Sequence, residues 1–206
     1  QILRKINRIV HGLKPSKIKK LFWSLKNNGL KETWNIIANN VQNGTTNTPY
    51  EIWMQFNDPT EEELKEQSKT KFEINPKISI LVPMYNTPVN FFAELVQYLI
   101  NQTYFNWELC LADGSPDKNI EIVKICKKDD RIKYNYTGEN LGISGNTNEA
   151  LKMATGDYIA LLDHDDLLPV NCLYEVVKAI NEDPNIEFIY TDEDKITTIN
   201  KPRFDP

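Results

Sequence analysis

From Lys77 onwards, short apolar runs alternate with segments whose apolar residues recur every three or four positions. A strand that is covered on both faces is apolar along its length, so the runs predict strands at residues 78–83, 107–112, 132–136, 158–162 and 186–190. The periodic segments predict helices at residues 88–101, 119–127, 144–154 and 169–181. Such an alternation is typical of an α/β fold with a doubly wound, mostly parallel sheet. In these sheets, ligands bind outside the carboxyl ends of the strands.

The front of the chain has a different composition. Residues 1–31 contain nine Lys or Arg and no acid, although the whole chain has a net charge of -5. Apolar stripes and breaks predict helices at residues 2–13, 16–29, 30–41 and 50–67. We therefore interpret residues 1–70 as a helical, basic amino-terminal extension, and residues 75–206 as the α/β domain.

The basic front segment has two interpretations. Its apolar stripe either packs on protein while the lysines stay solvated, which we favour, or lies on an anionic membrane surface. No apolar run approaches the roughly 20 residues that span a bilayer, and no signal peptide is recognisable. The widely spaced Cys110, Cys126 and Cys172 are typical of reduced core thiols. We expect a cytoplasmic protein without a nucleic-acid partner, with peripheral contact at the inner face of the cell membrane as the alternative.

Two carboxylates, Asp163 and Asp165, follow the fourth predicted strand directly. Alternate side chains of an extended segment project to the same side, so both can address one cation. Carboxylates suit Mn²⁺ or Mg²⁺, and substrate phosphates commonly complete the coordination shell of these ions. The alternative is an acidic turn that caps the next helix. The position at the binding edge of the sheet favours the cation.

Asp113 follows the second predicted strand and can accept a hydrogen bond from the imide N–H of uracil or thymine. An Asx turn that opens the bend at Gly114 is an equal alternative. If Asp113 binds a base, we expect Asp113→Ala to weaken nucleotide binding and to leave stability nearly unchanged. Tyr85 can stack on the base, and the backbone around Gly142 can approach phosphate. Plain packing and a glycine turn are the respective alternatives.

Taken together, these residues resemble the family 2 glycosyltransferases of bacterial polysaccharide and O-antigen synthesis, whose nucleotide-binding domain is called GT-A. Five segments carry the resemblance in order, at residues 80–86, 107–115, 139–148, 156–166 and 190–195. It implies a Rossmann-like fold and metal-dependent, inverting transfer of a sugar from a UDP-sugar or dTDP-sugar to a glycan or lipid-linked acceptor. In the family, Asp163-x-Asp165 corresponds to the DXD motif, which holds Mn²⁺ or Mg²⁺ on the diphosphate.

The resemblance implies that Pro83, Tyr85 and Asp113 bind the base and that Asp163 contacts the ribose or the metal. With the other polar residues at the strand ends, the predicted nucleotide-sugar site comprises Pro83, Tyr85, Asn86, Asp113, Asn140, Gly142, Asn148, Asp163, His164 and Asp165. The predicted metal ligands are Asp163 and Asp165.

The chain departs from the family pattern in three respects. Members often have two acids where this chain has Asp113-Gly114, and often a basic residue where it has Thr147. The usual catalytic base would lie beyond Pro206, so we assign no base. The acids at residues 192–194 are candidate sugar or acceptor contacts, or an exposed turn. Two alternative functions are a donor-binding fragment without turnover and a nucleotidyltransferase, although the Gly-rich basic loop expected of the latter is missing after the first strand.

Overall fold

The computed structural model describes residues 54, 57–196 and 203–204. Residues 59–189 form one compact unit, and the described residues outside this range belong to a second unit. The helices predicted between residues 2 and 41 lie outside the described residues, as does the basic segment 1–31. Among the described residues, no helix has the length and apolar character needed to cross a bilayer.

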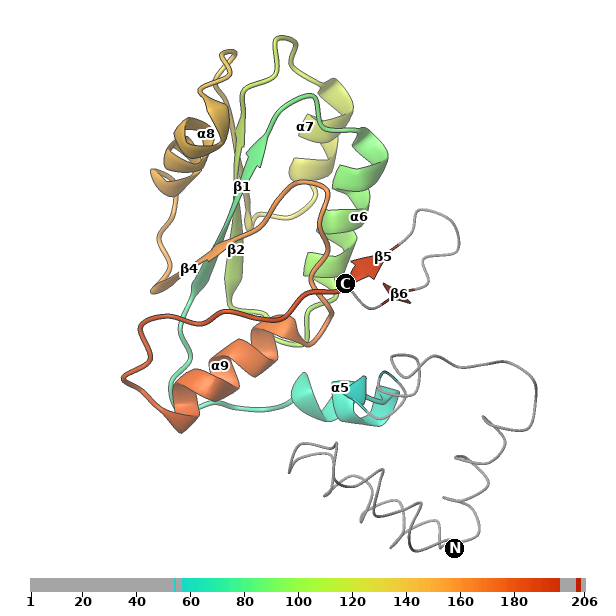
Figure 1. Ribbon diagram of the computed structural model, residues 1–206, viewed down its shortest axis with the longest axis vertical. Coiled ribbons are helices and arrows are strands. Elements are labelled where there is room, and N and C mark those ends of the chain that lie inside the picture. The colour runs from blue at the N-terminus through green and yellow to red at the C-terminus, as the bar shows by residue number, and fades with distance from the viewer. Residues whose placement is uncertain (1–53, 55–56, 197–202, 205–206) are drawn as a thin grey trace, which may run out of the picture. The chain divides into compact units, whose positions relative to one another are not determined.

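A parallel sheet of four strands organises the compact unit (Figure 1). The strands are β1 (Ile78–Met84), β2 (Trp107–Asp113), β3 (Ile132–Tyr136) and β4 (Tyr158–Leu161), in the spatial order β3-β2-β1-β4. All three pairings are parallel, with Ile78 opposite Trp107 on one side and opposite Tyr158 on the other. The predicted α/β fold class is therefore confirmed.

Helices cover both faces of this sheet (Figure 1). On one face, Ile80 and Leu109 pack in a common core with side chains of α6 (Val89–Ile100), α7 (Ile120–Cys126) and α9 (Cys172–Glu182). On the other face, Leu81 and Cys110 pack against Ala150 of α8 (Gly142–Leu151). The side chains of β1 and β2 alternate between these two cores, which explains why both strands are apolar along nearly their whole length.

Two predicted elements differ from the structure. The fifth strand, predicted at residues 186–190, is not formed, and Phe188 and Tyr190 are 83% and 82% exposed. A run of strand-forming residues specifies a strand only when a neighbour supplies hydrogen bonds, and the described sheet ends at β4. The helix predicted over residues 50–67 is interrupted before α5 (Glu61–Gln67). Thr60 and Glu63 form a capping box there, so that a new helix begins after Pro59.

Strand β1 passes through Pro83, where the sequence predicted its end. The carbonyl of Leu81 accepts a hydrogen bond from Leu162 N–H, so the backbone polar groups of Leu81 point towards β4. The backbone nitrogen of Pro83, two positions later, points to the same side. Because β4 ends at Leu161, no ladder hydrogen bond is lost at the proline. A small antiparallel pair, β5 (Lys195–Ile196) with β6 (Arg203–Phe204), belongs to the second unit.

Candidate functional site

The segments that follow β1, β2 and β3 are joined by hydrogen bonds at the carboxyl edge of the sheet. Gly114 N–H donates to the Met84 carbonyl at 2.9 Å, and Asn86 N–H donates to Ser115 Oγ at 2.8 Å. Thr137 N–H donates to the Asp113 carbonyl at 2.9 Å. The structure thus brings together three of the strand ends where the sequence predicted a ligand site.

The first of these segments presents an accessible aromatic ring. Tyr85 is 45% exposed, so its ring is available for stacking, while the neighbouring Pro83 is half-buried. Asn86 is exposed and has a φ of 50°, a left-handed conformation that asparagine tolerates better than most residues. The turn at Asn86 directs the chain away from the strand towards α6.

Asp113 is buried, and both of its carboxylate oxygens accept hydrogen bonds from the protein. Oδ1 accepts from Ser115 N–H at 3.0 Å and from Ser115 Oγ at 2.5 Å, whereas Oδ2 accepts from the Tyr134 hydroxyl at 2.7 Å. Burial raises the pKa of Tyr134, and its hydrogen bond to Asp113 raises it further. The Asx turn considered from the sequence is therefore present.

These contacts bear on the two roles considered for Asp113. A carboxylate oxygen has two lone pairs, so Oδ2 keeps one acceptor position beside the Tyr134 bond. Asp113 is only 1% exposed, so the base contact stays a prediction and requires this edge to open towards the base. Because Asp113→Ala removes the acceptor of three internal hydrogen bonds, we now expect this substitution to lower stability, in place of the small effect expected from the sequence.

Asn146 joins the edge of the sheet to α8, and sequence reasoning gave it no role. This side chain is 2% exposed, accepts from Leu141 N–H at 3.2 Å, and donates to the Met84 carbonyl at 3.5 Å and to Asn140 Oδ1 at 3.4 Å. A Cβ on Gly114 would lie 2.9 Å from Asn146 Nδ2, so the close approach requires glycine. A signal for this role exists, because asparagine is disfavoured inside helices unless its amide has a specific partner.

The loop before α8 presents the other predicted donor contacts. Asn140, Gly142 and Asn148 are exposed. Gly142 has a φ of 72°, which glycine adopts readily, and its N–H donates to Asn140 Oδ1 at 2.9 Å. The N-cap residue Leu141 makes no side-chain cap. A helix whose first turn is not capped by a side chain has backbone N–H groups there that can bind an anion.

The predicted metal ligands follow β4. Leu162 is buried, its N–H donates to the Leu81 carbonyl at 3.2 Å, and the chain then leaves the sheet. Asp163 and Asp165 are both exposed, His164 is half-buried, and Asp166 N–H closes a turn onto the Asp163 carbonyl at 3.2 Å.

These two carboxylates fit a cation that is shared with a substrate. In the described part of the chain, no group of three or more His, Cys, Asp or Glu is arranged to hold a metal. Mg²⁺ and Mn²⁺ need fewer protein ligands than that, because phosphates and water complete their coordination. The donor set of Asp163 and Asp165 therefore suits a metal that binds together with a diphosphate.

The remaining candidates are three acids after residue 189 and the three cysteines. Asp192, Glu193 and Asp194 belong to the second unit, outside residues 59–189. The three cysteines are free; Cys110 and Cys126 are buried, and burial raises the pKa of Cys110 to about 11 and that of Cys126 to about 12. These thiols fit the predicted role of reduced core residues.

Several known proteins are similar to this chain. The protein named UDP-Glc:alpha-D-GlcNAc-diphosphoundecaprenol beta-1,3-glucosyltransferase WfgD from Escherichia coli is 34% identical over 113 residues, which cover 55% of this chain and 44% of that protein. Protein y4gI of Sinorhizobium fredii is 40% identical over 129 residues, which cover 61% of this chain and 14% of that protein. The crystal structure of TarS from S. aureus has a TM-score of 0.47 at 28% identity, covering 52% of this chain and 20% of TarS.

The chain thus spans less than half the length of these relatives. The chondroitin synthase of Pasteurella multocida is 32% identical over 118 residues, which cover 56% of this chain and 12% of that protein. The sequence profile described as Glycosyl transferase family 2 matches residues 79–204, which include the four strands of the parallel sheet except Ile78 at the start of β1, and every predicted site residue. By this match, the chain belongs to glycosyl transferase family 2.

Proposed function

We propose that residues 59–189 bind a nucleoside diphosphate sugar at the carboxyl edge of the sheet and serve inverting sugar transfer in cell-surface polysaccharide synthesis. One observation carries this proposal: the ends of β1, β2 and β3 and the start of α8 are joined by hydrogen bonds, and two exposed carboxylates follow β4 at the same edge. Membership of the family supports the reaction class. The donor and acceptor that the name of WfgD gives support a UDP-sugar and a lipid-linked glycan.

The base lies, in this proposal, between the ring of Tyr85 and the carboxylate of Asp113. Tyr85 is exposed enough to stack, and Asp113 Oδ2 has an acceptor position left for the imide N–H of uracil. Thymine has the same imide, so a dTDP-sugar satisfies the same contact. Adenine has no imide, and cytosine presents an acceptor at that ring position. The proposal therefore predicts selection for UDP or dTDP.

The diphosphate lies between the start of α8 and the acids after β4. The first-turn N–H groups of α8 attract negative charge, and Asn140 and Asn148 add polar groups that are exposed there. Asp163 and Asp165 would hold Mn²⁺ or Mg²⁺, and His164 between them is a donor-side contact. When bound, the metal supplies Lewis-acid stabilisation of the charge that develops on the leaving diphosphate.

Transfer then requires an acceptor hydroxyl at the anomeric carbon. The bond from the hydroxyl oxygen to this carbon forms as the bond to the diphosphate breaks, and a base takes the hydroxyl proton. We assign no base among the described residues. Fixed N–H dipoles at α8 favour the departing diphosphate because its charge grows along the reaction.

A calorimetric titration of the chain with UDP, in Mn²⁺ or in EDTA, tests the proposal. We expect Mn²⁺ to raise the affinity at least about tenfold, and Asp165→Asn to remove this gain, since loss of a ligand commonly costs that much. The neighbouring Asp166→Asn is the control and keeps the gain. Equal affinity in EDTA and Mn²⁺ would refute the metal site. Product analysis with a UDP-sugar distinguishes transfer from binding without turnover, and a sugar phosphate with UTP tests for a nucleotidyltransferase.

Membrane contact through residues 1–31 is the alternative to the packing on protein that we favour for this segment. These residues lie outside the described part of the chain, and the support is their charge, nine basic residues and no acid. A basic residue gains about 1 kcal/mol near anionic lipid. An enzyme held at the inner face of the membrane would meet a lipid-linked acceptor there.

A further inference from the structure

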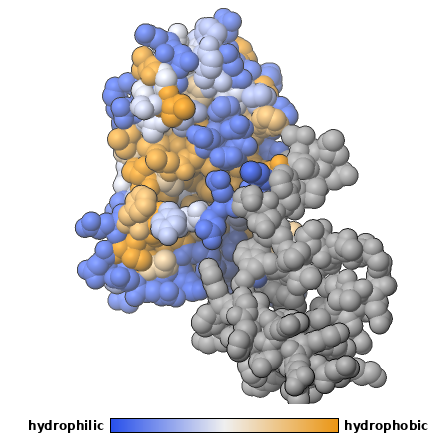
Figure 2. Space-filling model, in the orientation of Figure 1, coloured by the Kyte–Doolittle hydropathy of each residue, from blue (hydrophilic) through white to orange (hydrophobic). Residues whose placement is uncertain are grey.

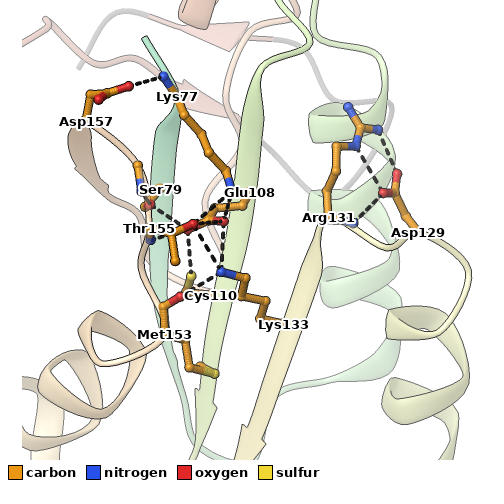
Figure 3. A network of polar contacts seen from close by, with 11 residues as sticks. Lys77, Ser79, Glu108, Cys110, Asp129, Arg131, Lys133, Met153, Thr155 and Asp157 are labelled. Carbon is orange, nitrogen blue, oxygen red and sulfur yellow. Dashed lines mark hydrogen bonds and ion pairs between the residues drawn. The ribbon is translucent and has the colours of Figure 1, made fainter.

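Glu108 is a buried carboxylate near the start of β2, at the end of the sheet opposite to the candidate site (Figure 3). Its side chain is 1% exposed and forms ion pairs with Lys77 and Lys133, the latter at 2.9 Å. It also accepts hydrogen bonds from Ser79 Oγ at 2.7 Å, and from the N–H and hydroxyl of Thr155 at 2.6 and 2.9 Å. Lys77 and Ser79 lie beside and on β1, Lys133 lies on β3, and Thr155 lies shortly before β4.

The network holds the short connection from α8 to β4. Thr155 binds Glu108 directly, and the next residue, Gly156, donates its N–H to Ser79 Oγ at 2.8 Å. Asp157 then accepts from Lys77 N–H at 2.7 Å. Three consecutive residues are thus fixed to β1 and β2 immediately before β4 begins (Figure 3).

Gly156 makes this attachment specific for one register. A Cβ at this position would lie 2.5 Å from the Lys77 carbonyl oxygen and 2.7 Å from Ser79 Oγ. A shift of β4 by one residue would bring Thr155 or Asp157 into a space that accepts only glycine. The connection therefore tolerates one alignment of β4 on β1.

The rest of β4 selects this alignment only in part. It has four residues, pairs with β1 alone among the described strands, and lies at the edge of the sheet. Ala160 and the following Leu162 pack in the core, but Ile159 and Leu161 are 45% and 74% exposed, and Figure 2 shows apolar surface over this part of the unit. Because register is specified most strongly where a face is buried, a short, half-exposed strand gains from a fixed connection. A slip of one residue would exchange the two faces of β4 and would displace the start of the segment that carries Asp163 and Asp165.

We propose that Glu108 is a positioning residue whose carboxylate fixes the register of β4, and thereby the place of Asp163 and Asp165, seven or more residues after the Gly156 contact. This inference rests on the proposed function for the role of the two acids. It goes beyond that function because Glu108 lies at the other end of the sheet and contacts none of the residues predicted to bind the metal or the nucleotide. Glu108 acts through the connection and the strand.

The charge of Glu108 suits a fixed attachment. Burial alone would raise the pKa of Glu108, but hydrogen bonds and ion pairs from Lys77, Lys133, Ser79 and Thr155 outweigh burial and hold the pKa well below its usual range. The carboxylate therefore stays ionised at any physiological pH. Lys133 also donates to the Met153 carbonyl at 2.8 Å, so the network reaches the end of α8 as well.

The test separates metal-dependent from metal-independent binding. Calorimetry measures UDP with Mn²⁺, UDP with EDTA, and uridine, for the native chain and for Glu108→Gln. We expect Glu108→Gln to reduce the Mn²⁺-dependent gain at least about tenfold, as remote changes that misplace reacting groups can. Uridine binding depends on β1 and β2 and stays unchanged. Ser79→Ala is a milder second variant, which leaves Glu108 in place and should show the same selectivity.

Asp129→Asn is the control for loss of an ion pair, in this case a half-buried one. Asp129 binds Arg131 at 2.6 Å before β3, at the same end of the sheet, and contacts nothing in the connection to β4 (Figure 3). We expect this variant to lose stability while its Mn²⁺-dependent gain remains. If Glu108→Gln keeps the native gain, or if Asp129→Asn loses it equally, Glu108 is only structural.

Hydrogen exchange decides the inference without a nucleotide. The amide of Leu162 is bonded to Leu81 at the far end of β4, so its exchange reports the register there. We expect faster exchange at Leu162 in Glu108→Gln than in Asp129→Asn at matched global stability. Equal exchange in the two variants would overturn the inference. If the native chain binds no nucleotide but the exchange differs as expected, the proposed function fails and the positioning of β4 stands.

Discussion

The substitution Asp113→Asn replaces one carboxylate oxygen with an NH₂ group. We expect it to change the base that the site prefers from uracil to cytosine. The oxygen bonded to Ser115 keeps its acceptor role, and the new amide group takes the place of Oδ2 beside Tyr134. Uracil presents an N–H donor to this position, and two donors repel each other. Cytosine presents a ring nitrogen that accepts. We therefore expect the native chain to prefer UDP and the variant to prefer CDP.

The structure sets the magnitudes. A hydrogen bond to a charged group contributes about 1.5–3 kcal/mol, so UDP should lose about 10- to 100-fold in affinity. Asp113→Ala instead leaves Ser115 N–H and the Tyr134 hydroxyl without their acceptor, at a cost of roughly 3 kcal/mol of unfolding free energy in total. For a unit of this size, such a loss lowers Tm by roughly 10 °C. Asp113→Asn retains most of the internal bonds, and we expect a fall of only a few degrees.

Calorimetric titrations with UDP and CDP measure the change in affinity, and thermal melts measure the change in Tm. Tyr134→Phe is the matched control, because it removes the other partner of Oδ2 and lowers stability without changing the acceptor that faces the base. This variant should keep the preference for UDP. A preference for UDP that survives Asp113→Asn would show that Asp113 only forms the turn, and the base contact would have to be abandoned.

Two further predictions follow from charge. The pKa of Glu108 lies below its ordinary value of 4.5 in the folded chain, so its stabilisation is complete above that pH and is lost as the pH falls towards the folded pKa. Urea melts should therefore show the stability difference between the native chain and Glu108→Gln narrowing as the pH falls from about 5 to about 3, and a constant difference would contradict the ionised state. Deletion of residues 1–31, which carry nine basic residues, should abolish co-sedimentation with anionic vesicles at low salt. Unchanged binding, or no binding of the intact chain, would leave packing on protein as the role of this segment.

All four strands of the parallel sheet were predicted from their apolar runs. β2 is buried at every position and β1 at all but Pro83, whereas the edge strands β3 and β4 have no fully buried residue and still form where the sequence predicted them. The run at residues 186–190 has a similar composition and forms no strand, since pairing depends on a neighbour that periodicity does not reveal. Local composition therefore indicates which segments can form a strand, but it does not show whether a partner strand lies beside them.

Polar residues at the candidate site were predictable by position, and their internal partners were not. The place of Asp113 after β2 follows from the strand pattern, but the bond from Tyr134 joins residues 21 positions apart. Asn146 reaches the end of β1 across 62 positions. No alignment of motifs with strands gives such contacts, because they depend on how closely α8 approaches the sheet, which Gly114 permits.

The same limit explains why Glu108 escaped notice. Within an apolar strand, a single Glu resembles an exposed position on an edge, and its two lysine partners lie 31 and 25 positions away along the chain. A buried ion pair by itself is weak support for stability, because desolvation offsets much of the attraction. The contribution of this ion pair is specificity. The carboxylate accepts a hydrogen bond from Thr155, and only glycine fits beside Ser79 at position 156. One alignment of the short, half-exposed strand β4 on β1 is therefore favoured over alignments shifted by one residue. A charge buried at one end of the sheet can thus govern where two exposed charges stand at the other.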